Sequence, residues 1–116
     1  MGLDFNFGEA HWSYSGFNNF RIKLAREIGI NLDDMEGFAP NIEGGRWDLI
    51  KDPIAPLLNH SDCDGWLTVA QCKKIAPRLR KLVDKWDDDD YDKSRALELA
   101  KGMDEAVKAN SRLMFC

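Results

Sequence analysis

TVAQCKKIAPRLRKLVDKW, residues 68–86, is the stretch that decides the fold, because it carries clear signals of a helix. Thr68 and Gln71 match the S/T-x-x-E/Q capping box, which satisfies backbone N–H groups where a helix begins. An apolar stripe follows at helical spacing and consists of Leu79, Leu82, Val83 and Trp86. Pro77 lies within the pattern, and a proline there removes a hydrogen bond and clashes with the preceding turn. The stretch therefore predicts a helix that opens at Thr68 and has a kink or a break near Ala76.

Helical patterns also lie on both sides of this stretch. A first helix is predicted over about 16–28, with Ser15 as its N-cap and Gly29 as its C-terminal stop. A short helix is predicted to begin at Asp52-Pro53, since Asp caps helices well and proline suits the first helical position. A last helix is predicted over about 91–109, and its apolar face carries Leu97, Ala100, Met103 and Val107.

Both ends of the chain show the alternation of a half-buried strand. Apolar and polar residues alternate from Leu3 to Phe7, and again around Leu113 and Phe115. The simplest use for two lone terminal strands is to pair with each other, since an unpaired strand leaves its backbone groups without partners. We therefore predict a mainly α fold, in which residues 1–116 form one domain of four to five helices. A small two-stranded β element would be made from the N- and C-terminal segments.

Length and composition restrict the classes of protein that fit. The 116 residues suit one domain, and 44% apolar against 31% charged residues suit a packed core. No apolar run approaches the roughly 18–20 residues of a membrane span, and the N-terminus lacks the basic and apolar regions of a signal peptide. The cysteines are odd in number, form no CxxC pair, and lie at Cys63, Cys72 and Cys116. We therefore expect reduced thiols and a cytoplasmic protein that does not bind membranes.

Charge is unevenly distributed along the chain. The net charge of −4 disfavours binding to nucleic acid. Residues 71–85 nevertheless carry six basic side chains and one Asp, and residues 87–92 carry five Asp. Two interpretations are open. The runs can be a solvated helix face beside an acidic turn, or the basic run can be a face that docks a partner.

NHSDCDGWLT, residues 59–68, lies just before the capped helix and resembles a degenerate EF-hand loop. The third, fifth, sixth and ninth loop positions match the pattern and are Asp62, Asp64, Gly65 and Thr68. The first position is His60 instead of Asp, and the twelfth is Gln71 instead of the bidentate Glu. Calcium prefers about six to eight oxygen ligands. The resemblance therefore implies at most a weak site for Ca²⁺ or another divalent cation, held by His60, Asp62, Asp64 and Thr68.

The same loop admits other roles. A transition metal could be held by His60, Asp62 and Cys63, joined by His11 and Cys72. A small hydrolase could use His60 with Asp62 or Asp64 as its acid and base. The plainest role is a helix–loop–helix turn, whose Asp side chains bond their own backbone and cap the next helix. Apart from such a cation no cofactor is expected, and a non-enzymatic role is favoured over catalysis.

HWSYSGFNNFR, residues 11–21, is a second polar cluster, placed just before the first helix. Backbone N–H groups at a helix start, two hydroxyls and a nearby Arg suit an anion, and Trp12 or Tyr14 could stack on a flat ring. If the two clusters meet in space, the ligand-binding residues are Trp12, Ser13, Tyr14, Ser15, Gly16, Arg21, His60, Asp62 and Asp64. The alternative is that Ser15 only caps the helix and the aromatic residues belong to the core.

GLDFNFG, AHWSYSGFNNFR, PLLNHSDCDGWLT and the ending LMFC together resemble a family of small uncharacterised proteins from bacteria and their phages. SYSGF and NHSDCDG are its specific motifs. The resemblance implies an intracellular accessory protein, of bacterial, prophage or phage origin, that binds a host protein or a small host molecule. Counter-defence is one such role.

The predicted function is therefore a non-enzymatic binding protein for a host protein or a small polar ligand. The alternatives are a degenerate EF-hand-like cation-binding protein and a small hydrolase. A monomer and a dimer both fit the sequence, because surplus aromatic residues can cover a core or a dimer interface. These residues are Trp47, Trp66 and Trp86.

Overall fold

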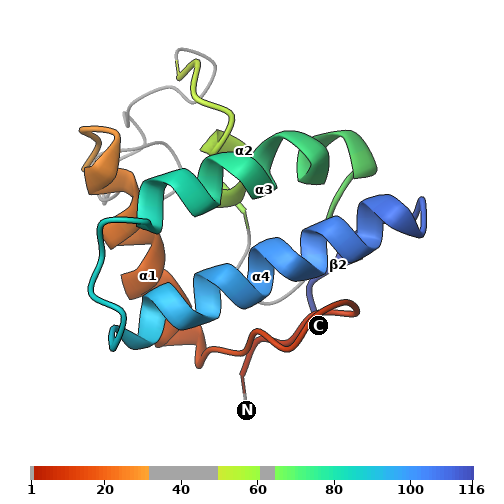
Figure 1. Ribbon diagram of the computed structural model, residues 1–116, viewed down its shortest axis with the longest axis horizontal. Coiled ribbons are helices and arrows are strands. Elements are labelled where there is room, and N and C mark those ends of the chain that lie inside the picture. The colour runs from red at the N-terminus through yellow and green to blue at the C-terminus, as the bar shows by residue number, and fades with distance from the viewer. Residues whose placement is uncertain (1, 32–49, 61–64) are drawn as a thin grey trace.

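The computed structural model describes residues 2–31, 50–60 and 65–116. This part of the chain forms four helices and a two-stranded antiparallel sheet (Figure 1). The helices are α1 (Tyr14–Glu27), α2 (Ala55–Leu58), α3 (Val69–Val83) and α4 (Tyr91–Lys108), and the strands are β1 (Trp66–Leu67) and β2 (Leu113–Met114). The predicted mainly α fold is confirmed. None of the described helices combines the length and the apolar character that crossing a membrane requires.

α3 and α4 lie side by side in opposite directions and form the main helical layer (Figure 1). The predicted capping box is present, since the Gln71 N–H donates to Thr68 Oγ1 at 3.1 Å and the Thr68 N–H donates to Gln71 Oε1 at 2.9 Å. Of the predicted kink or break near Ala76, the break is wrong, because the helix continues through Pro77 to Val83. Pro77 lies on the exposed face, where water can bond the carbonyl that the proline leaves without a helical partner. On α4, Leu97 was expected to face the core but is 41% exposed.

α1 begins earlier than the sequence pattern predicts. Its N-cap is Ser13 instead of Ser15, and the Ser13 hydroxyl accepts the N–H of Gly16 at 3.0 Å. The helix ends before Gly29, whose φ of +76° is the left-handed conformation predicted for the stop. The face turned to the core carries Phe17, Phe20, Leu24 and Ala25.

The two ends of the chain meet beside β1. The sheet joins β1 to β2, and its register is Trp66↔Met114 and Leu67↔Leu113. The N-terminal segment lies on the other side of β2, where Phe5 forms a single bridge with Phe115. There Asn6 donates its N–H to the Met114 carbonyl at 3.3 Å, and its Oδ1 accepts the Met114 N–H at 2.7 Å. The small β element is thus present and the chain ends contact each other as predicted. The strand that pairs with the C-terminal segment over two residues is β1, which the sequence patterns do not indicate as a strand.

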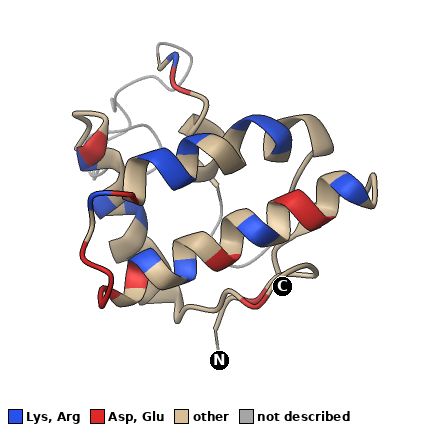
Figure 2. Ribbon diagram, in the orientation of Figure 1, with Lys and Arg blue, Asp and Glu red and all other residues tan. Residues whose placement is uncertain are grey.

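The acidic run after α3, largely red in Figure 2, forms the turn that leads to α4, and two lysines bond to it. Lys93 Nζ donates to two backbone carbonyls at the end of α3 and to the carboxylate of Asp88 at 2.8 Å. Lys23 Nζ, from α1, donates to Asp90 at 2.9 Å and to Asp92 at 3.1 Å. Asp90 is also the N-cap of α4. The run is therefore a turn that ties α1, α3 and α4 together, which agrees with the interpretation as an acidic turn.

Candidate functional site

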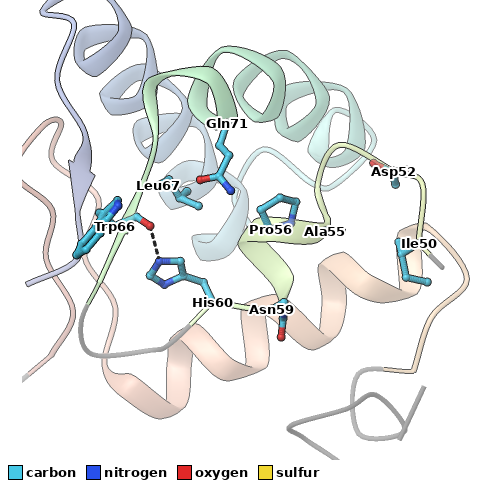
Figure 3. A pocket seen from close by; sticks show the side chains of 9 residues that line it. All are labelled: Ile50, Asp52, Ala55, Pro56, Asn59, His60, Trp66, Leu67 and Gln71. Atoms are coloured by element: carbon cyan, nitrogen blue, oxygen red, sulfur yellow. Dashed lines mark hydrogen bonds between the residues drawn. The ribbon is translucent and has the colours of Figure 1, made fainter. Parts of the chain in front are cut away.

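A pocket of about 550 Å³ opens between α2, β1 and the first turns of α3 (Figure 3). Its apolar walls are Ile50, Ala55, Pro56, Trp66 and Leu67, and its polar lining is Asp52, Asn59, His60 and Gln71. The volume lies within the range of roughly 300–1,000 Å³ that is usual for small-ligand sites. Described residues from the start and from the end of the stretch 59–68 line this pocket, among them His60 and Trp66. The pocket is therefore the candidate functional site.

Trp66 turns its backbone carbonyl toward His60 in the pocket, whereas its ring lies on the other side of β1 (Figure 3), and 48% of its surface is exposed. The guanidinium carbon of Arg112 lies 4.7 Å from the ring centroid, which is a cation–π contact. The Arg112 carbonyl in turn accepts a hydrogen bond from the Asn6 side chain at 3.1 Å. A large aromatic side chain that stacks on a guanidinium and is open to solvent is suited to recognition.

His60 is held on three sides. Its Nε2 donates to the carbonyl of Trp66 at 3.0 Å, drawn as the dashed line in Figure 3. Its ring stacks on Phe115, with 3.7 Å between the centroids and 22° between the planes. Its backbone carbonyl accepts a hydrogen bond from Nη1 of Arg21. The imidazole is therefore a fixed part of the pocket wall.

Arg21 is the point where the two predicted clusters meet. Its side chain is buried, at 3% exposed. The guanidinium carbon lies 4.9 Å from the ring centroid of Phe17, and Nη2 donates to the Asn18 side chain at 3.2 Å. The bond from Arg21 to the His60 carbonyl joins α1 to the first position of the EF-hand-like loop. Arg21 thus supports the pocket from behind and does not line it.

The rest of the 11–21 cluster lies away from this pocket. Trp12 is buried in the core, where its ring stacks on Phe20 with centroids 4.7 Å apart and its Nε1 donates to Asp92 at 3.1 Å. Ser13 caps α1 through the Gly16 N–H, Tyr14 is half-buried against the core, and Ser15 is exposed. The structure therefore places Trp12 and Ser13 in structural roles, and it does not bring this cluster and the pocket together as one cavity.

The polar lining of the pocket is largely uncharged. Asn59 is exposed at the end of α2, and Gln71 points into the space between Leu67 and Pro56 (Figure 3). Asp52 is the exception. The predicted N-cap is wrong, because α2 begins at Ala55 and its N-cap is Ile54. The Asp52 carboxylate accepts the Ile54 N–H just before the helix, and the guanidinium of Arg78 bonds this carboxylate at distances down to 2.6 Å. The hydrogen bonds from Arg78 hold the pKa of Asp52 below its ordinary value, although burial opposes the shift.

The described residues among the EF-hand-like positions 60–71 keep several features of an EF-hand loop. Gly65, at the sixth position, has a φ of +91°, and β1 and the capped start of α3 follow it. Two ligand positions are bonded within the protein, however. The Nε2 of His60 bonds the Trp66 carbonyl, which would itself be the seventh-position ligand, and Gln71 bonds the Thr68 N–H. This arrangement does not fit a hard cation well. Asp62 and Asp64 lie outside the described residues, so the cation site stays a prediction.

The transition-metal prediction meets a similar limit. Cys63 also lies outside the described residues. Cys72 is buried, and that burial raises the pKa of its thiol to about 11, which disfavours the thiolate that metals bind. Within residues 2–31, 50–60 and 65–116 no group of three or more His, Cys, Asp or Glu side chains is placed to hold a metal ion.

The sequence patterns did not assign Asn59, Trp66 or Arg112 to the site. Trp66 carried one signal, because the seventh position of an EF-hand loop uses a backbone carbonyl and leaves the side chain free. Arg112 carried none, since its contact with Trp66 depends on the pairing of β1 with β2. No family model, curated protein or solved structure has a significant match to the chain.

Proposed function

We propose that the chain is a non-enzymatic binding protein, which holds a host protein or a small polar ligand at the pocket between α2, β1 and α3. The observation that carries this proposal is the half-exposed ring of Trp66, stacked with Arg112 beside a pocket of about 550 Å³. Leaving a tryptophan ring in water forgoes roughly 2–3 kcal/mol of burial free energy. A partner that covers the ring would recover that free energy on binding.

The chemistry of the pocket suits an uncharged or weakly polar group with an apolar surface. Pro56 and Leu67 offer apolar contact, and Asn59 and Gln71 offer amide donors and acceptors. The Asp52 carboxylate is already neutralised by Arg78. The imidazole of His60 is bonded to the Trp66 carbonyl and forms part of the pocket wall. This supports the binding interpretation over the hydrolase alternative, in which His60 acts as an acid or a base.

The cellular setting is part of the proposal. The resemblance to small bacterial and phage proteins supports a cytoplasmic accessory role, counter-defence included. The pocket supplies a means for such a protein to act, since binding alone can block a host protein or withdraw a small host molecule.

The proposal is tested by nuclear magnetic resonance with a fragment library of flat heterocycles and primary amides. Bound fragments are expected to shift the Trp66 indole resonance and the side-chain amide resonances of Asn59 and Gln71. Trp66→Ala should weaken binding at least tenfold, about 1.4 kcal/mol or more. Tyr91→Ala is the matched control, because Tyr91 is also an exposed aromatic, at 56%. Equal binding to the Trp66 variant and to the unmodified protein would contradict the proposal.

A cation-binding loop is the second candidate, favoured by the left-handed Gly65 and the strand that follows it. It predicts that Ca²⁺ raises the melting temperature, because a ligand at 100 times its Kd adds about 2.7 kcal/mol of stability. The measurement is thermal unfolding over a calcium titration, with Asp64→Asn as the control that should abolish the shift. An unchanged melting temperature removes this candidate and leaves the binding pocket unaffected.

A further inference from the structure

The exposed apolar surface beside the pocket extends further than the pocket itself. In the β1–β2 pair, Leu67 and Leu113 are buried, whereas their neighbours Trp66 and Met114 are 48% and 38% exposed. Trp66 and Met114 are cross-strand partners, so their side chains lie on the same face of the sheet. We call Trp66, Met114 and Arg112 the ribbon patch. An apolar surface that continues from a pocket onto an open face is typical of protein interfaces.

The ribbon patch also carries positive charge. The Arg112 guanidinium stacks on Trp66, and among the residues that the structure describes no carboxylate forms an ion pair with it. A guanidinium presents a planar fork of N–H donors that matches a carboxylate. A complementary occupant therefore has acidic side chains next to an apolar one.

The residue types of the patch agree with this conclusion. Trp, Met and Arg are enriched at protein interfaces, and Trp and Arg are enriched among the residues that dominate binding energy. A small ligand in the pocket would leave Met114 exposed, whereas a protein segment that crosses the sheet would cover it.

We propose that the occupant is a segment of another protein, with one large apolar side chain in the pocket and an Asp or Glu against Arg112. This inference rests on the proposed function and names its partner as an acidic–apolar protein segment.

α4 offers a matched control for the experiment. Arg95 lies 4.9 Å over the ring of Tyr91, which is 56% exposed, so this pair has the same stacking as Arg112 on Trp66. The Tyr91 hydroxyl donates to the His11 carbonyl at 3.2 Å, away from the pocket. Charge reversal at Arg95 therefore changes the same kind of contact without changing the proposed surface.

The test selects peptides from a phage-displayed random library on the full chain and measures the affinity of an enriched peptide by fluorescence anisotropy. The enriched peptides are expected to share a large apolar residue beside Asp or Glu. Trp66→Ala and Arg112→Glu should each lower affinity at least tenfold, and Arg95→Glu should change it less than twofold. Exchanging the peptide's acidic residue for Lys should restore binding to Arg112→Glu and weaken binding to the unmodified chain.

The outcomes separate this inference from the proposed function. Fragments that bind the pocket while no peptide is enriched would overturn the inference and leave the proposed function standing. Peptides that bind Trp66→Ala as well as the unmodified chain would overturn it too, as would a Lys-bearing peptide that fails to restore binding to Arg112→Glu. If neither fragments nor peptides bind, both proposals fail. Circular dichroism shows whether each variant folds. If Trp66→Ala does not fold, Arg112→Glu still tests the inference.

Discussion

Asp52 has two roles at the rim of the pocket. One carboxylate oxygen accepts the N–H of Ile54, the N-cap residue of α2, at 3.0 Å, and both oxygens accept hydrogen bonds from Arg78 on α3. The side chain is 16% exposed, so solvent screens the pair less than it screens a surface salt bridge. One side chain therefore fixes the distance between two walls of the pocket.

The pH dependence of stability tests this role. Arg78 lowers the pKa of Asp52 in the folded state below its ordinary 3.8. A lowered pKa stabilises the fold above pH 3.8, and this stabilisation is lost as the pH falls through the folded value. Asp52→Asn keeps an oxygen that can accept the Ile54 N–H but removes the charge, so we expect about 1 kcal/mol of destabilisation at pH 7 and a smaller effect near pH 2.

Urea unfolding at several pH values measures the difference. Asp104→Asn is the control, because Asp104 also pairs with an Arg, Arg80, but is 54% exposed. That surface pair should contribute no more than about 0.5 kcal/mol. Equal losses for Asp52→Asn at pH 7 and pH 2 would show that the charge pair does not stabilise the fold.

At the scale of the elements, local sequence signals predict where a helix lies but not which of two neighbouring residues caps it. The capping box at Thr68 and the stop at Gly29 are local chemistry, and both are present. Ser13 and Ser15 are equally good caps by type. The choice falls on Ser13 because Trp12 bridges Leu3 and is buried in the core, which leaves Ser13 as the next residue with extended backbone. That choice depends on a tertiary contact.

The pocket was predictable only in part for the same reason. His60 stood out by its place in the loop, but a strand of two residues, Trp66–Leu67, gives no alternation to detect. Arg112 reaches Trp66 only because β2 pairs with β1. At Pro77 a local rule predicted a kink or a break, and the helix does not break, since α3 has buried residues on both sides of the proline and packs against α4.

At the scale of the whole molecule, the C-terminal segment assembles the site from parts that are distant in the chain. Phe115 stacks on His60 and contacts Phe5 and Phe17, with centroids 4.9 Å and 6.1 Å away. Its N–H donates to the Gly65 carbonyl at 2.9 Å. The two ends of the chain therefore meet beneath the pocket, and stability and binding share this residue.

Phe115→Leu tests that shared role. Leucine keeps the core apolar but loses the stacking on His60, so we expect roughly 1–2 kcal/mol of destabilisation and weaker binding of fragments or peptides at the pocket. Chemical unfolding and the Trp66 indole shift report the two effects separately. Met114→Ala, on the exposed face of the same strand, should lower peptide affinity with little loss of stability. If Phe115→Leu lowers stability but leaves binding intact, His60 does not need Phe115 to hold the pocket wall. The site would then depend on β1 and Arg21 alone.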